Sequence, residues 1–210
     1  MKSIFFEEKT QVHSSETLER LTGLSEFYFD KDTIVTFEGK VDIAAGIHFR
    51  GKCFIGNEVS IDTGCILRNV TIGGRSNVRS YSVLENSIFG KDNIIGPFCF
   101  IRNKSLVSDN CIVGSHVEVA RSNIGSNVKI SHQAFIGDAI IEKSVIIGAG
   151  VVFCNYDGTD KKSSSVGQGS ILGSGSMIVS PIKIGSNVVI GAGSTVTKDI
   201  KDNSRFIQKR

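Results

Sequence analysis

The sequence predicts an all-β chain wound into a parallel β-helix of about nine coils, preceded by a short α-helical segment. Large apolar residues recur every six positions, and glycine often follows them directly. This period matches neither the 3.6 residues of a helix nor the two of a plain strand. The 23 glycines, two prolines and absence of tryptophan indicate many tight corners rather than long helices.

The repeat is a triplet of apolar positions that returns every 17 or 18 residues, with one longer interval. The first triplet is Phe37, Ile43 and Phe49, and the last is Ile184, Ile190 and Val196. Nine triplets give 27 positions, all large and apolar, in a chain that is 40% hydrophobic. A short strand and a corner, three times per coil, explain this spacing. Stacked coils then pair as parallel strands about 4.8 Å apart.

The residues outside the repeat form the two ends. The stretch "SSETLERLTGL" predicts a helix capped by Ser14 or Ser15, and "FYFD" predicts a strand leading into the prism. We expect this segment to cover the open first coil, as solenoid ends require. We expect the basic tail to leave the prism after Val196. The predicted divisions are a cap over residues 1–36, a β-helix domain over 37–198 with a loop at 154–165, and a tail over 199–210.

Composition limits the functional classes. A net charge of +3 is too small to indicate nucleic-acid binding. The start resembles no signal peptide and no run of about 18 apolar residues is present, so we expect a cytoplasmic protein with no membrane partner. Four cysteines fall four residues after an apolar anchor, where side chains are small, and are expected in the core: Cys53, Cys65, Cys99 and Cys111.

One coil carries an insertion between Phe153 and Val166. The segment "CNYDGTDKKSSS" is polar and contains glycine, so it must project as a loop. A β-helix needs no such loop for its stability, which makes the insertion a candidate functional element. Asn155 and Tyr156 place an amide and a phenol near its base.

His132 is the candidate base. It lies two residues after an anchor, and the next three coils carry Ala149, Ser174 and Ala192 at the same position. These four residues should stack along one edge, forming a shallow channel with a base at one end. An extended thiol-bearing arm would lie well in it. The other three histidines share no edge with His132, so the sequence supports no metal site.

Three stretches carry a resemblance to a known family: "HQAFIGDA", "IGAGVVFCNYDG" and "IGAGSTVTKDI". They are similar to the acetyltransferase half of the bacterial bifunctional enzyme of UDP-N-acetylglucosamine synthesis, a glucosamine-1-phosphate N-acetyltransferase. The likeness runs from about Val35 to the end. It implies a left-handed prism, a homotrimer with sites between prisms, and acetyl-CoA as acetyl donor without a metal.

The resemblance also assigns roles to single residues. His132 matches the family's catalytic base, and Glu118 matches the acidic residue associated with it. The residues that match the acceptor site are Arg102, Asn155, Tyr156 and Lys161. Those that match the acetyl-CoA channel are Ala149, Ser174 and Ala192, with Lys209 or Arg210 near the coenzyme phosphates.

Three departures from the family fall on the acceptor side. Ala120 replaces a lysine, although Arg121 follows as an available substitute. Phe135 replaces a tyrosine, and Ile146 replaces an asparagine. A site that hydrogen-bonds its substrate discriminates strongly, so these changes can alter the acceptor.

The expected function is therefore N-acetylation of an amino sugar, glucosamine-1-phosphate or a related phosphorylated or nucleotide-linked sugar. His132 would act as general base, with the backbone N–H of Gly148 or Gly173 at the oxyanion. Only about 36 residues precede the repeat, so we expect no uridyltransferase activity. Two alternatives remain open: a sugar O-acetyltransferase, and a non-catalytic trimeric scaffold for a separate nucleotidyltransferase.

Overall fold

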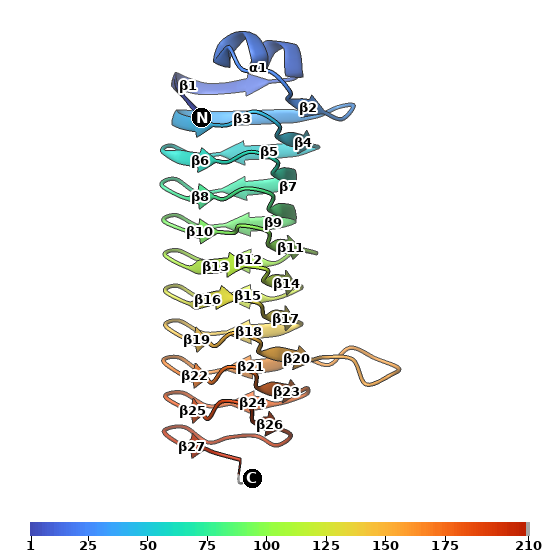
Figure 1. Ribbon diagram of the computed structural model, residues 1–210, viewed down its shortest axis with the longest axis vertical. Helices are drawn as coiled ribbons and strands as arrows, with labels where there is room; N and C mark the ends of the chain where they lie inside the picture. Colours follow the sequence, from blue (N-terminus) through green and yellow to red (C-terminus); the bar gives the residue numbers. More distant parts are fainter. Residues whose placement is uncertain (209–210) are drawn as a thin grey trace.

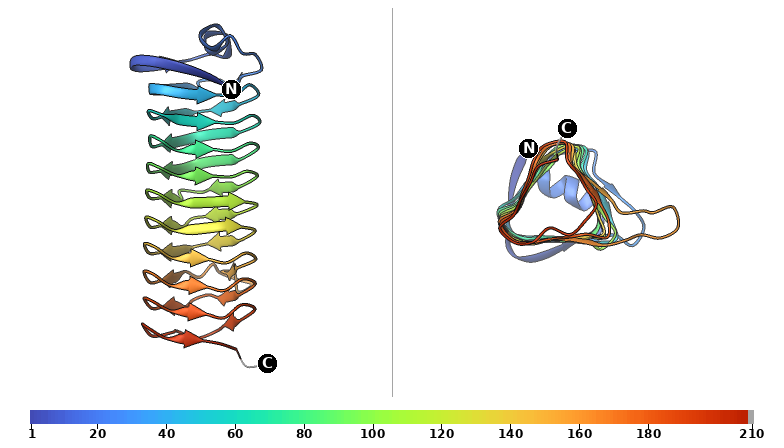
Figure 2. Two further views of the ribbon diagram at one scale, coloured as in Figure 1. Left: turned by 60° about the vertical axis from the view of Figure 1, so that its left-hand side comes forward. Right: turned by 90° about the horizontal axis from the view of Figure 1, so that it is seen from below.

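The computed structural model describes residues 1–208 and forms a left-handed parallel β-helix, a three-sided prism (Figures 1 and 2). The fold class predicted from the six-residue period is confirmed. All 27 anchor positions are buried, and none exposes more than 3% of its surface. The core is thus one continuous column of apolar side chains along the prism axis.

Each coil contributes one strand to each of three faces, here called A, B and C. Face A holds β5 (Lys52–Ile55), β12 (Leu106–Val107), β15 (Asn123–Ile124), β18 (Ala139–Ile141), β21 (Ser164–Val166) and β24 (Lys183–Ile184). Face B holds β6 (Val59–Ile61), β8 (Asn77–Val78), β10 (Ile94–Ile95), β13 (Ile112–Ser115), β16 (Lys129–His132), β19 (Ile146–Ile147), β22 (Ile171–Leu172), β25 (Val189–Ile190) and β27 (Arg205–Phe206).

Face C holds β2 (Tyr28–Phe29), β4 (His48–Arg50), β11 (Phe100–Arg102), β14 (Glu118–Ala120), β17 (Phe135–Gly137), β20 (Val152–Cys154), β23 (Met177–Val179) and β26 (Thr195–Val196). Three longer strands bend around a corner: β3 (Ile34–Ile43) runs from face A to face B, and β7 (Ile66–Ile72) and β9 (Val83–Phe89) run from face C to face A.

The N-terminal end is covered by a strand and a helix. β1 (Lys2–Val12) pairs antiparallel with β3, and α1 (Ser15–Thr22) lies over it (Figure 1). The Ser14 hydroxyl accepts from the N–H of Thr17, which caps the predicted helix. The strand predicted in "FYFD" is β2, whereas β1 was not predicted. β1 occupies the backbone edge of β3 that the first coil would otherwise leave unpaired, and its Phe6 ring stacks on Phe37.

The C-terminal end differs from the expected tail. Ile200 forms a parallel bridge with Ile184, and β27 pairs with β25, so the chain begins a further coil after Val196. Ile200 and Phe206 are six residues apart, and the apolar period itself continues there. The expected coenzyme contacts of residues 209 and 210 (Lys209 and Arg210) lie outside the described residues.

The four cysteines expected in the core are buried and unpaired. Burial raises the pKa of the Cys65 thiol to about 12 and that of Cys99 to about 11. A thiol held in its neutral form is a poor nucleophile, so these residues act as small core side chains. Over residues 1–208, no helix has the length and apolar character needed to cross a membrane.

Candidate functional site

His132 is the last residue of β16 and lies at the corner between faces B and C. Its side chain is exposed, and no hydrogen bond to it from another described residue is found. Ser115 of the preceding coil lies beside it in register. In the following coils, Gly175 N–H donates to Ala149 O and Gly193 N–H donates to Ser174 O, both at 2.8 Å, whereas Gly150 N–H donates to Gln133 O and not to His132 O.

The strand register aligns Ile130, Ile147, Leu172 and Ile190, and the residues two positions further on form one edge of the prism. We call this edge, made of His132, Ala149, Ser174 and Ala192, the B–C row. Glycines beside it let the coils approach closely. A Cβ on Gly148 would lie 2.5 Å from Ser174 N, and one on Gly173 would lie 2.5 Å from Ala192 N. These glycines are thus required by the stacking of the backbone.

The expectation that the backbone N–H of Gly148 or Gly173 binds an oxyanion is wrong. Gly148 N–H donates to Leu172 O at 2.8 Å, and Gly173 N–H donates to Ile190 O at 2.9 Å. Both groups are used in the parallel ladder, so neither is free for a ligand. The N–H groups of Ala149 and Ser174, by contrast, donate to no other residue within 1–208.

The same corner is filled on the N-terminal side of His132. Tyr81, Phe98 and His116 stack in successive coils, with ring centroids 5.5 and 5.3 Å apart. The expectation that no other histidine shares an edge with His132 is therefore wrong, because His116 lies at this corner one coil before it. The Ser115 hydroxyl lies 2.6 Å from His116 Nδ1. The open part of the corner therefore runs from His132 toward the C-terminus only.

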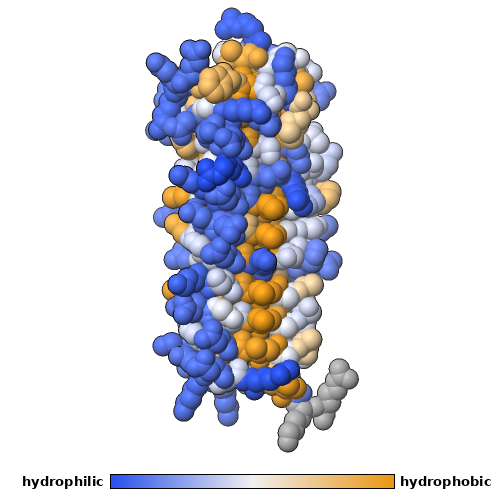
Figure 3. All heavy atoms as spheres, turned by 90° about the vertical axis from the view of Figure 1, so that its left-hand side faces the viewer, coloured by the Kyte–Doolittle hydropathy of each residue, from blue (hydrophilic) through white to orange (hydrophobic). Residues whose placement is uncertain are grey.

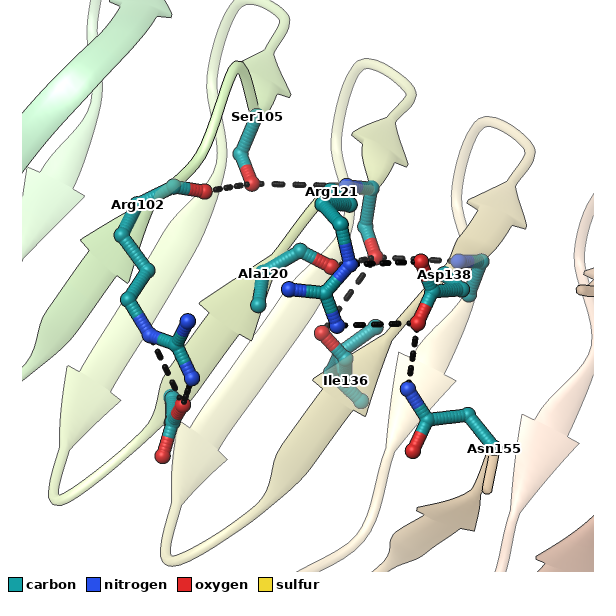
Figure 4. A network of polar contacts seen from close by, with 10 residues as sticks. Arg102, Ser105, Ala120, Arg121, Ile136, Asp138 and Asn155 are labelled. Atoms are coloured by element: carbon teal, nitrogen blue, oxygen red, sulfur yellow. Dashed lines mark hydrogen bonds and ion pairs between the residues drawn. The ribbon is translucent and has the colours of Figure 1, made fainter. Parts of the chain in front are cut away.

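Face C and its corner with face A carry charged side chains instead. Arg102 Nε and a terminal guanidinium nitrogen (Nη2) donate to the same Glu118 oxygen (Oε1), at 3.1 and 2.5 Å (Figure 4). Glu118 thus takes Arg102 as its partner within the chain. The part of the chain that the structure describes contains no hydrogen bond between Glu118 and His132.

A second pair lies one coil further along. Arg121 donates through Nε and Nη2 to the two Asp138 oxygens, at 2.6 and 2.9 Å, and the Asn155 amide also donates to Asp138 (Figure 4). The hydrogen bonds from Arg121, the larger cause, and from Asn155 hold the pKa of Asp138 below its usual value. Asp138 was missed by the sequence analysis. The signal was its spacing, since Arg121, Asp138 and Asn155 are each 17 residues apart, one coil.

The inserted loop projects from this corner, as predicted (Figures 1 and 2). Its base is closed by Lys162 N–H donating to Asn155 O at 2.7 Å and by an antiparallel bridge between Tyr156 and Lys161. Asn155 is buried at 8% exposure, whereas Tyr156 is 60% exposed. Lys162 lies 3.3 Å from Asp160, while Lys161 forms no ion pair with a described residue.

The three positions that depart from the family lie around these corners. Ala120 is completely buried, in register between Arg102 and Gly137. Phe135 follows Glu118 on face C, and Ile146 is 43% exposed on face B.

Ile146 belongs to an apolar column on face B, which we call the B stripe (Figure 3). Lys129 interrupts the column once, and its other members are Ile94, Ile112, Ile146, Ile171 and Val189. Within residues 1–208, no group of three histidine, cysteine, aspartate or glutamate side chains is placed to hold a metal.

Fold and repeat define the class of this protein as a hexapeptide-repeat β-helix. Residues 163–198 match the family model "Bacterial transferase hexapeptide (six repeats)", and residues 32–122 match the "GMPPB C-terminal domain". The UDP-N-acetylglucosamine acyltransferase LpxA of Bacteroides fragilis shares the fold. Its TM-score is 0.54 at 18% identity, over 83% of this chain and 66% of that one.

The curated relatives are bifunctional GlmU proteins, and the chain is their homologue. It is 41% identical to the protein of Ruthia magnifica over 181 residues and 38% identical to that of Baumannia cicadellinicola over 159 residues. These stretches cover 86% and 76% of this chain. The chain spans only 40% and 34% of those relatives' lengths. The family predicted from the motifs is thereby confirmed.

Proposed function

We propose that this chain is an acetyl-CoA-dependent N-acetyltransferase that acts on an amino sugar, with His132 as the general base. The observation that carries the proposal is the B–C row, which ends at an exposed imidazole and is otherwise lined by small residues. Homology to the bifunctional GlmU proteins supports an acetyl transfer. Glucosamine-1-phosphate is the first acceptor to test.

In this mechanism the acceptor amine attacks the thioester carbonyl of acetyl-CoA. His132 removes the proton that the amine loses, and the tetrahedral intermediate collapses by breaking the carbon–sulfur bond. The proton then passes to the departing coenzyme A thiolate. The unengaged N–H of Ala149, next to His132 in the row, replaces the two glycine N–H groups as the candidate oxyanion donor.

The acceptor would be held from the corner between faces C and A. Arg121 lies at that corner, Arg102 and Glu118 lie on the adjoining face C, and Asn155 and Tyr156 place the loop beside them. His132 and this corner flank the same face of one prism. One chain can therefore supply both groups, and the homotrimer that the resemblance implies is proposed separately.

We assign the contact between copies to the B stripe. An apolar column along one face is the kind of surface that subunit interfaces cover. Light scattering should then give three times the 22.6 kDa of one chain. Exchange of the exposed Ile171 for lysine should lower the mass toward that of one chain, and an unchanged trimer would place the contact on another face.

The function is tested by coenzyme A release from acetyl-CoA with glucosamine-1-phosphate, with a His132→Ala variant beside the wild type. A general base contributes about 10²- to 10⁴-fold to the rate, so the variant should lose activity on that scale. Isothermal titration with acetyl-CoA should still show binding. Full activity of the variant would exclude His132 as the base. If wild type does not bind acetyl-CoA, the scaffold alternative is favoured.

A further inference from the structure

A histidine that acts as a base needs a partner for the ring nitrogen that does not react. A neutral imidazole carries one proton, and the hydrogen bond made by one nitrogen decides which nitrogen keeps it. Glu118, the acidic residue that the resemblance associates with His132, does not supply that bond within one chain. It is held by Arg102, and its neighbour in register is Phe135. The residue in register with His132 is Ser115.

Ser115 and His132 lie side by side on two successive coils. They are paired in the parallel register of β13 and β16, and Gln133 N–H donates to Ser115 O at 2.9 Å. The coils approach closely here, because a Cβ on Gly114 would overlap Ser131 O. Paired positions on neighbouring strands are about 4.8 Å apart, so rotation of the exposed imidazole brings it within hydrogen-bond reach of the Ser115 hydroxyl. Catalytic hydrogen bonds commonly tighten in this way only when substrate is bound.

The Ser115 hydroxyl already has a partner in its own coil. Ser115 Oγ lies 2.6 Å from His116 Nδ1. The His116 ring is stacked 5.3 Å from Phe98, which is stacked 5.5 Å from Tyr81. The φ angles of these three ring-bearing residues are all positive, from 55° to 59°. Bulky residues adopt this conformation only where the surrounding structure holds them in it. The stack therefore fixes the position of His116 Nδ1.

The direction of the bond between Ser115 and His116 decides what Ser115 offers to His132. A hydroxyl group has one proton and two lone pairs. When that proton is given to His116 Nδ1, Ser115 retains only lone pairs and can only accept a hydrogen bond from His132. The nitrogen of His132 nearer the backbone, Nδ1, then carries the proton that is donated. The outer nitrogen, Nε2, is left unprotonated.

We propose that Ser115 and His116 are positioning residues that hold His132 in its Nδ1-protonated form, with Nε2 free to act as the base. His132 Nδ1–H donates to Ser115 Oγ, and the Ser115 hydroxyl donates to His116 Nδ1. The inference rests on the proposed function and adds the two residues that orient its base. A base held in the wrong tautomer slows the proton transfer but leaves the coenzyme site intact. Loss of the pair should therefore lower kcat and leave the KM for acetyl-CoA unchanged.

Kinetics of three variants test the pair. Ser115→Ala should lower kcat about tenfold or more, with the KM for acetyl-CoA within about twofold of wild type. Ser115→Thr keeps the hydroxyl and should keep kcat within about threefold of wild type. His116→Phe keeps a ring in the stack but removes the nitrogen, and should lower kcat about threefold or more. Ser131→Ala is the matched control, because Ser131 is the other partly exposed serine beside His132. A kcat of Ser115→Ala equal to that of Ser131→Ala would overturn the proposal.

Nitrogen NMR reads the tautomer of His132 without turnover. Protonated and unprotonated ring nitrogens give separate signals, and those of His132 are assigned by their absence from His132→Ala. In wild type, at a pH where His132 is neutral, the proton should lie on Nδ1, and in Ser115→Ala it should move toward Nε2. A wild-type proton on Nε2 overturns the proposal. Full activity of His132→Ala instead rejects the proposed function, so the two failures are distinguishable.

Discussion

Two neighbouring corners of the prism are built in opposite ways. Beyond His132 the B–C row carries only small side chains, and its shape is set by backbone hydrogen bonds between glycine-rich coils. The corner between faces C and A is filled with long charged side chains that are tied in pairs across coils. The shape of the B–C row follows from the register of the coils. The shape of the charged surface depends on which side chains pair with each other.

The largest expected effect is that of a bulky substitution in the B–C row on the binding of acetyl-CoA. Ala192→Phe should raise the KM for acetyl-CoA at least tenfold while the fold persists, because Ala192 is exposed and a ring there obstructs the channel. Steady-state kinetics with acetyl-CoA varied would measure it. Gln168→Phe is the matched control, since Gln168 occupies the corresponding exposed position on the corner between faces A and B. If both variants keep the wild-type KM, acetyl-CoA does not lie along this row.

A smaller effect tests whether the backbone shapes the row. Gly148→Ala should lower the free energy of unfolding by about 1–3 kcal/mol, because the new Cβ would overlap the next coil. Urea denaturation would measure the loss. Gly191→Ala is the control at the equivalent position, where the nearest atom to a Cβ is 3.5 Å away. Equal stabilities of the two variants would contradict the close approach at Gly148.

The smallest effect concerns the charged corner. Because the pKa of Asp138 is lower in the folded chain than in the unfolded one, its contribution to stability is present above about pH 4. That contribution is lost as the pH falls through the folded pKa. Wild type should therefore lose about 1 kcal/mol more than Asp138→Asn between pH 7 and pH 3, measured by urea denaturation. Parallel losses in the two proteins would mean that the pair does not stabilise the fold.

The sequence predicts the first corner far better than the second. The anchors, the corner glycines and the row below His132 all follow from one period, because each coil repeats the backbone of the last. The six-residue period does not predict which side chain pairs with Glu118. Arg102 lies 16 residues away, and whether its guanidinium turns to a carboxylate or to a ligand depends on side-chain packing. β1 was not predicted for a related reason, because its antiparallel pairing with β3 is not part of the repeat.

The inserted loop leaves the register of the prism unchanged. Ala139–Ile141 pairs with Ser164–Val166 directly, as if the intervening residues were an ordinary coil, and the loop closes on itself through Asn155 and Lys162. In evolutionary terms the loop is an insertion that can be exchanged without disturbing the coils on either side of it. The length and composition of the loop can change while the prism that carries His132 stays the same. A new acceptor can therefore be acquired without a new fold.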